Sequence, residues 1–231
     1  MGGLKAVFLT EMYIEKLKKW NKPFSHIYCI RLFRDCVEET FCDAEDSELS
    51  KSFFAFFFRE WLPYNICQED DEIIEMMYGR IRDMCKFCDR KTGTKLFSSF
   101  VSLAPFTAGE TKRIMYVKKH IMQFIKSPVI NKRPEVIDLA RYRIKRLALP
   151  KNRQDFLPEE GYFKVADIFT NNSVVLKKIS GYTFFIRVYF DGPVIDKIRP
   201  GDMLDMKVRY IDNITGWRVE DISGCLARDS I

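Results

Sequence analysis

Residues 203–211 read Met-Leu-Asp-Met-Lys-Val-Arg-Tyr-Ile, and this stretch decides the fold of the C-terminal part of the chain. Apolar side chains occupy every second position from Leu204 to Tyr210. The positions between them are the charged residues Asp205, Lys207 and Arg209. Successive side chains of a β-strand point to opposite faces of a sheet. The pattern therefore predicts a strand with one buried face and one solvated face.

Four further segments show strand-like patterns and are separated by turn residues. The expected strands are Tyr162–Phe169, Val174–Ile179, Tyr182–Phe190 and Trp217–Ile222. Five short strands of this kind most often close into a small barrel, because closure removes exposed sheet edges. The turn within Ile198–Leu204 resembles the turn that precedes a strand in OB-like and SH3-like barrels. This fold-level resemblance implies a five-stranded antiparallel β-barrel over residues 156–231.

Upstream of residue 155 the apolar spacing is helical rather than alternating. The expected helices cover residues 10–20, 25–41, 48–61, 69–88, 110–126 and 135–147, while 96–106 stays ambiguous. In the first helix, Tyr13, Leu17 and Trp20 lie at the spacing of one apolar face. Pro63 is expected to end the third helix. The predicted fold class is α+β: an N-terminal helical bundle, residues 1–155, followed by the small β-barrel.

The composition is that of an ordinary globular protein. The chain has 231 residues, 47% of them hydrophobic and 30% charged, with a net charge of +6. No segment reaches the roughly 20 apolar residues of a membrane helix, and the N-terminus lacks the apolar core of a secretory signal. Seven cysteines without regular spacing favour reduced, buried thiols. We therefore expect a cytoplasmic protein with no membrane partner.

The charges are strongly segregated along the chain. Residues 38–75 contain twelve acidic residues and two basic ones, whereas residues 112–153 contain thirteen basic residues and two acidic ones. A concentrated basic segment attracts polyanions or an acidic protein surface. Alternatively, the two segments neutralise each other within the fold.

Two groups of residues are candidates for binding nucleic acid. Lysines and arginines of the basic helices can neutralise phosphates, and the best candidates are Lys118, Lys119, Arg141, Arg143, Lys145 and Arg146. On the expected barrel, Phe185, Arg187 and Tyr189 alternate with Ile186 and Val188 and share the opposite face. Aromatic residues around an arginine can stack on single-stranded bases, although the same face could instead pack against the helices.

No catalytic or metal-binding motif is recognisable. The spacing of Cys85 and Cys88 matches half of a zinc site, but no second pair follows at a suitable distance, so a structural role is favoured. Phosphate-binding loops, dinucleotide fingerprints and hydrolase motifs are missing from the sequence, and only His26 and His120 could serve as a histidine base. We expect no enzyme activity, no metal and no cofactor.

Two hypotheses of function remain open. The first is a non-catalytic nucleic-acid-binding or accessory protein that uses the basic helical surface and the aromatic barrel face. The second is a protein-interaction adaptor or regulatory subunit with complementary acidic and basic surfaces.

Overall fold

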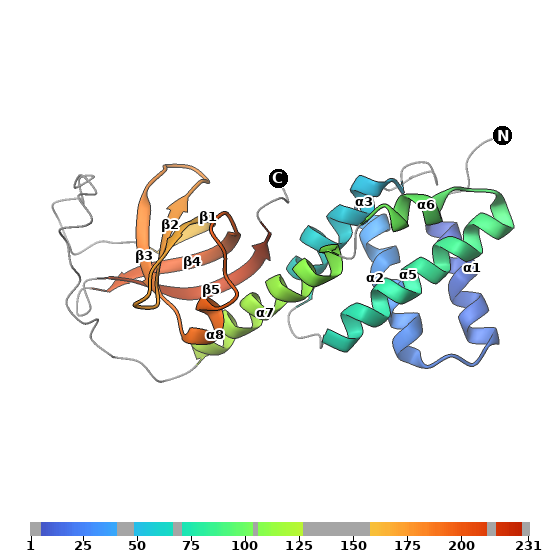
Figure 1. Cartoon of the computed structure of the whole chain (residues 1–231), viewed down its shortest axis with the longest axis horizontal. Helices are drawn as coiled ribbons and strands as arrows, with labels where there is room; N and C mark the ends of the chain where they lie inside the picture. The colour runs from blue at the N-terminus through green and yellow to red at the C-terminus, as the bar shows by residue number, and fades with distance from the viewer. Residues whose placement is uncertain are drawn as a thin grey trace. The chain divides into compact units, whose positions relative to one another are not determined.

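A computed structural model describes residues 6–40, 49–66, 71–103, 106–126, 158–211 and 216–227 (Figure 1). The fold class is α+β, as predicted: the N-terminal part is helical, and the C-terminal part is a curled, five-stranded antiparallel sheet. Internal contacts divide the chain into two compact units, a helical unit that runs to Met115 and a strand unit that begins at Tyr116. This division falls inside a helix, whereas the expected boundary at residue 155 lies outside the described residues.

Within the described residues, the helical unit contains seven helical segments and the first half of an eighth. Their bounds are α1 Ala6–Lys19, α2 Phe24–Thr40, α3 Lys51–Phe56, η2 Phe57–Trp61, α4 Leu62–Asn65, α5 Asp71–Thr92, α6 Leu96–Val101 and α7 Phe106–Lys126. The predicted helices over 10–20, 25–41, 69–88 and 110–126 are confirmed in position. The expected helix over 135–147 lies outside the described residues.

The third predicted helix differs from expectation at both ends. Its cap is Ser50, whose hydroxyl accepts from the Phe53 amide, so the helix begins at Lys51 and not at residue 48. Pro63 does not end the helix, because a π-helical turn precedes it: the Leu62 N–H donates to the Phe57 carbonyl. Proline has no N–H to offer to the Phe58 carbonyl. The Thr111 hydroxyl donates to that carbonyl instead, at 2.8 Å, and so fastens α7 to the π-helix.

The core of the helical unit contains a cluster of aromatic rings in mutual contact. Phe33 lies at its centre, with its ring 5.1 Å from that of Phe57 and 5.7 Å from that of Phe54. Phe54 also packs edge-on against Phe100. The phenylalanines of α3 and the π-helix therefore make contacts on several sides of the helix. None of the described helices has the length and apolar character needed to cross a membrane.

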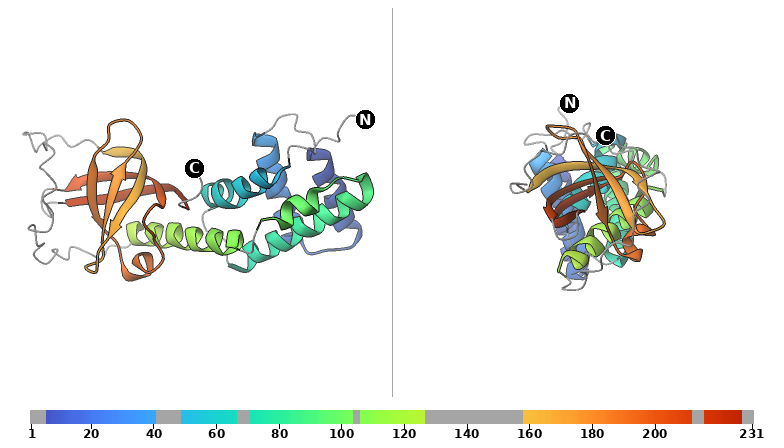
Figure 2. Two further views of the ribbon diagram at one scale, coloured as in Figure 1. Left: turned by 45° about the horizontal axis from the view of Figure 1, so that its top comes forward. Right: turned by 90° about the vertical axis from the view of Figure 1, so that its left-hand side faces the viewer.

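The strand unit contains five antiparallel strands in the order β3-β2-β1-β4-β5. Their bounds are β1 Glu159–Ile168, β2 Ser173–Lys178, β3 Phe185–Tyr189, β4 Met203–Ile211 and β5 Gly216–Leu226. The predicted strand over 203–211 is confirmed with the same limits. A short helix, α8 Gly192–Ile195, was not predicted and separates β3 from β4. Figure 2 shows the sheet curling, and its edge strands β3 and β5 also contact each other.

The inner side of the curled sheet is the second core. Alternation along the strands places Phe163, Leu176, Val188 and Leu204 on this side, all fully buried. The end of α7 belongs to the strand unit, where the Phe124 ring lies 6.2 Å from that of Phe190. The outer side of β1, β2 and β3 is consequently the side on which polar and charged residues gather.

Candidate nucleic-acid interface

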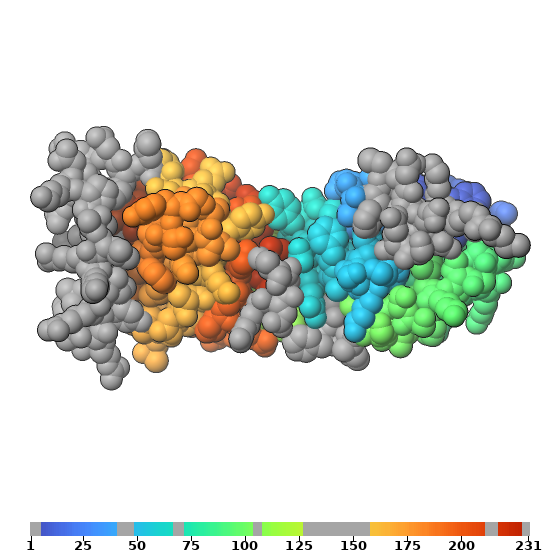
Figure 3. Space-filling view, turned by 90° about the horizontal axis from the view of Figure 1, so that it is seen from above, coloured from blue at the N-terminus to red at the C-terminus, as the bar shows by residue number. Residues whose placement is uncertain are grey.

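Strand β3 presents the three predicted residues on its outer side. Ile186 and Val188 are buried, whereas Phe185, Arg187 and Tyr189 occupy the alternate positions, with Phe185 43% exposed. The period-two pattern thus predicted correctly which side chains share a face. Residues of β1 to β3, in yellow and orange, are in view on one side of the space-filling picture (Figure 3).

Aromatic contacts at the start of β3 fix this orientation. The Phe184 ring lies 5.9 Å from Trp217 and 6.5 Å edge-on from Phe163, so it points inward. The Lys178 ammonium lies 5.6 Å from the same ring and forms an ion pair with Glu159 at 2.5 Å. Since successive strand residues point to opposite faces, anchoring Phe184 inside turns Phe185 outward.

The pairing of strands adds two lysines to this face. Lys177 of β2 lies opposite Phe185, and Lys164 of β1 lies opposite Lys177; both lysines are exposed. Sequence analysis missed these lysines, because only the register of the strands brings them beside Phe185. We call the following six residues the strand face: Lys164, Phe169, Lys177, Phe185, Arg187 and Tyr189.

Arg187 is held in place by an aromatic ring. Its guanidinium lies 5.1 Å from the centre of the Phe169 ring, at the β1–β2 turn. A cation over an aromatic face is stabilised by the ring quadrupole, which also limits the motion of the side chain. The strand face therefore carries three cations and three aromatic rings. Phe185 and the two lysines are exposed, whereas Phe169, Arg187 and Tyr189 are partly buried, and the Tyr189 hydroxyl is buried without a hydrogen-bond partner among the described residues. Asp167 of β1 adds a carboxylate opposite Val175, which is buried.

The basic helix α7 provides less surface than predicted. Lys118 was expected on the surface but is only 1% exposed, and Arg113 is also buried, in an ion pair with Glu110 at 2.8 Å. Lys119 remains partly exposed. Lys112 forms an ion pair with Glu75, so at this point the basic and acidic segments do meet within the fold. Arg141, Arg143, Lys145 and Arg146 lie outside the described residues.

Cys85 and Cys88 are both fully buried in α5. Burial raises the pKa of the Cys88 thiol to about 12 and that of Cys85 well above its ordinary value. Thiols with raised pKa values are poor nucleophiles at neutral pH. In the part of the chain that the structure describes, no three His, Cys, Asp or Glu side chains are arranged to hold a metal ion.

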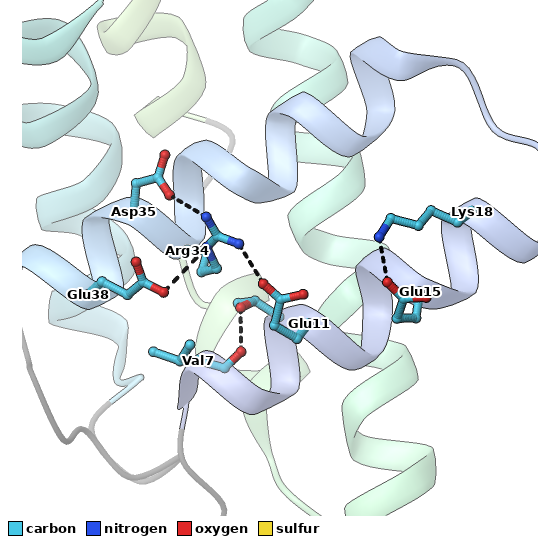
Figure 4. Close-up of polar contacts among 8 residues, drawn as sticks. Val7, Glu11, Glu15, Lys18, Arg34, Asp35 and Glu38 are labelled. Carbon is cyan, nitrogen blue, oxygen red and sulfur yellow. Dashed lines mark hydrogen bonds and ion pairs between the residues drawn. The ribbon is translucent and has the colours of Figure 1, made fainter.

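A second, acidic surface lies on α1 and α2 (Figure 4). Arg34 is surrounded by three carboxylates, at 2.5 Å from Glu11, 3.1 Å from Asp35 and 3.4 Å from Glu38. Hydrogen bonding to Glu11 raises the pKa of the Arg34 guanidinium. Three negative charges around one positive charge leave this surface negative overall.

No protein-family model, curated protein or solved structure matches this chain. The interpretation of the strand face therefore rests on its geometry and charge.

Proposed function

We propose that the protein is a non-catalytic nucleic-acid-binding protein that holds a single strand on the strand face. The gathering of three cations and three aromatic rings on the outer side of one curled sheet is the observation that supports this proposal. Lysine and arginine side chains neutralise phosphates, and every base has a flat face that can stack on an aromatic ring.

The order of the strands adds support from the fold. A five-stranded antiparallel sheet in the order β3-β2-β1-β4-β5, with contacts between β3 and β5 and a helix between β3 and β4, has the connectivity of an OB-type barrel. Barrels of that type use the face of β2 and β3 for oligonucleotides. We propose that the sheet closes as such a barrel and that its β2–β3 face is used in this way.

The basic residues of the helices have a supporting role in this proposal. Lys119, Arg141, Arg143, Lys145 and Arg146 add sequence-independent attraction to phosphates. Lys118 is left out of the proposed surface because it is buried.

Binding of labelled single-stranded and double-stranded oligonucleotides across a salt series tests the proposal. Phe185→Ala should weaken single-strand binding about tenfold through loss of one stacked base. Lys177→Ala should reduce the slope of log K against log salt by about 0.7, the loss of one phosphate contact on a single strand. Lys51→Ala, which removes an exposed lysine at the start of α3, is the control and should change neither value.

A protein-interaction adaptor is the competing proposal, and the acidic surface around Arg34 favours it. Charge reversal at Arg141, Arg143, Lys145 and Arg146 should reduce nucleic-acid retention in the first case and protein association in the second. If the wild-type protein binds no oligonucleotide even at low salt, the nucleic-acid proposal is wrong and the adaptor proposal takes its place.

A further inference from the structure

The turn between α1 and α2, residues 16–24, combines positive charge with exposed aromatic rings. Residues 16–31 contain five lysines and arginines and no acidic residue. Four of these are lysines of the turn or its approach: Lys16, Lys18, Lys19 and Lys22. Lys18 is neutralised by Glu15 at 2.5 Å (Figure 4), which leaves Lys19 and Lys22 as the lysines nearest the apex.

Backbone hydrogen bonds make this turn rigid. The Lys22 N–H donates to the Leu17 carbonyl and the Asn21 N–H donates to the Lys18 carbonyl, while Asn21 has a φ of 49°. This pair of bonds around a left-handed residue is a Schellman motif, which satisfies carbonyls at the end of α1. Trp20 is the residue just before the left-handed position, so its backbone is held in place.

The Trp20 side chain is also held, although it is 58% exposed. The Lys16 ammonium lies 4.2 Å from the centre of the Trp20 ring system and 4.0 Å from the centre of the Phe87 ring. The Lys16 ammonium therefore lies close both to the partly buried Phe87 ring and to the exposed Trp20 ring. Trp20 was expected on the apolar face of the first helix, and this expectation was wrong, because the helix ends at Lys19 and the ring is exposed.

Phe24 provides a second exposed ring at the start of α2. It is 68% exposed and stacks on Tyr28 with 6.4 Å between ring centres. Exposing two large rings within five residues costs hydrophobic free energy, unless a ligand covers them. Positive charge next to both rings indicates that such a ligand is anionic.

The order of residues at the apex argues against insertion into a membrane. The apex itself is Asn21-Lys22-Pro23, and the two rings stand on either side of it. Inserting the rings into a bilayer would carry Asn21 and the Lys22 ammonium into the apolar region first, at considerable cost. A strand lying across the turn can contact the rings and the lysines together without burying either polar side chain.

We propose that the α1–α2 turn is a second site for single-stranded nucleic acid, separate from the strand face. A base stacks on the open side of the Trp20 ring, a second base stacks on Phe24, and Lys19 and Lys22 bind the phosphates. This inference rests on the proposed function. A peptide with acidic side chains alone would satisfy the lysines but would leave the two rings uncovered.

The test uses the full chain and a fluorescently labelled oligothymidylate at several salt concentrations. Trp20→Ala should weaken binding five- to twentyfold, as expected for the loss of one stacked base. Phe8→Ala is the matched control, because Phe8 is a ring of similar exposure on α1 and lies outside the turn. It should leave the affinity unchanged. Circular dichroism checks that both variants keep the helical content of the wild type.

A second set of variants separates this site from the strand face. With Phe185→Ala and Arg187→Ala combined, the residual binding should disappear when Trp20→Ala is added. If Trp20→Ala has no effect in either background while the strand-face variants lose affinity, this inference is wrong and the proposed function stands. If the strand-face variants bind normally and Trp20→Ala does not, the turn is the site and the strand face is not.

Photocross-linking and vesicles complete the test. An oligonucleotide that contains 5-iodouracil should cross-link to the peptide that carries Trp20 and Phe24. The absence of any cross-link there, or of any binding by the wild type, overturns the inference. Sedimentation with anionic phosphatidylserine vesicles that is lost on Trp20→Ala, with oligonucleotide binding unchanged, would identify a membrane site and overturn it as well.

Discussion

Phe57 in the helical unit and Phe185 in the strand unit have the same side chain, but the first is buried and the second is exposed. Phe57 is fully buried, with its ring close to those of Phe33, Phe58 and Trp61. Phe185 is 43% exposed and lies opposite a lysine. The difference shows that the same ring can be core in one unit and surface in the other, and that in this comparison the exposed ring is the one that lies beside a charged residue.

The two units also differ in how they position their rings. The helical unit fixes them by mutual contact in a core that extends through α2, α3, α5 and α6. The strand unit fixes Phe185 indirectly, through the inward anchor of Phe184 and the alternation of β3. A ring positioned in this way stays available to a ligand without a loss of packing, which is the property that a stacking surface needs.

The largest expected effect is the difference in stability between Phe57→Ala and Phe185→Ala. Phe57→Ala removes a fully buried ring and should lower the free energy of unfolding by about 3–5 kcal/mol. Phe185→Ala should change it by less than about 0.5 kcal/mol, the range of exposed positions. Urea denaturation followed by circular dichroism measures both. A large loss of stability for Phe185→Ala would mean that this ring is part of a core and not of a binding surface.

The parts of the fold that could be predicted from sequence are those set by patterns among neighbouring residues. Alternation is a property of adjacent residues, so the strand over 203–211 and the outward face of β3 could be read directly. The continuation of the third helix past Pro63 could not, because the Phe58 carbonyl that Pro63 leaves without a backbone donor is satisfied by the hydroxyl of Thr111, far along the chain. Long-range pairing of that kind leaves no periodic signal.

The same distinction explains what was predicted of the candidate site. Phe185, Arg187 and Tyr189 follow from one strand, whereas Lys164 and Lys177 join them only through the register of three strands. Helical spacing predicts the relative angles of side chains around an axis, and it says nothing of which neighbours cover them. For this reason, the burial of Lys118 and the exposure of Trp20 were both missed.

The second prediction concerns the bond that fastens α7 to the π-helix. Thr111→Val keeps the shape of the side chain but removes the hydroxyl that donates to the Phe58 carbonyl. A buried carbonyl without a partner costs about 1–3 kcal/mol, so the variant should lose that amount in free energy of unfolding. Thr111→Ser retains the hydroxyl and is the control. A Thr111→Val variant as stable as the wild type would show that this hydrogen bond does not contribute to stability.

Glycine substitutions provide a third contrast between the units. Gly161 in β1 has a φ of +125°, and a Cβ there would lie 2.2 Å from the Ser180 hydroxyl oxygen, so Gly161→Ala should cost roughly 1–3 kcal/mol. Gly79 in α5 has open space around its Cα, so Gly79→Ala should add up to about 1 kcal/mol. Thermal unfolding measured by circular dichroism shows whether each variant is less or more stable than the wild type. A destabilising Gly79→Ala would mean that α5 needs the glycine.

The smallest expected effect is a pH dependence in the helical unit. Burial lowers the pKa of His26 below its ordinary value of 6.5, and the positive charges of Arg80 and Lys22 lower it further. The folded protein thus holds fewer protons on this imidazole than the unfolded chain does. Its contribution to stability is complete above pH 6.5 and is lost as the pH falls from there towards the lowered pKa of the folded state.

His26→Gln isolates this contribution from the carboxylates that titrate at lower pH. The free energy of unfolding of the wild type should fall more steeply than that of the variant as the pH is lowered just below 6.5. Because the chain has only two histidines, the imidazole signal that disappears from the proton NMR spectrum of His26→Gln identifies the residue and gives its pKa directly. A midpoint above 6.5 for that signal would reverse the sign and would show that a carboxylate, and not the Arg80 guanidinium, dominates the surroundings of His26.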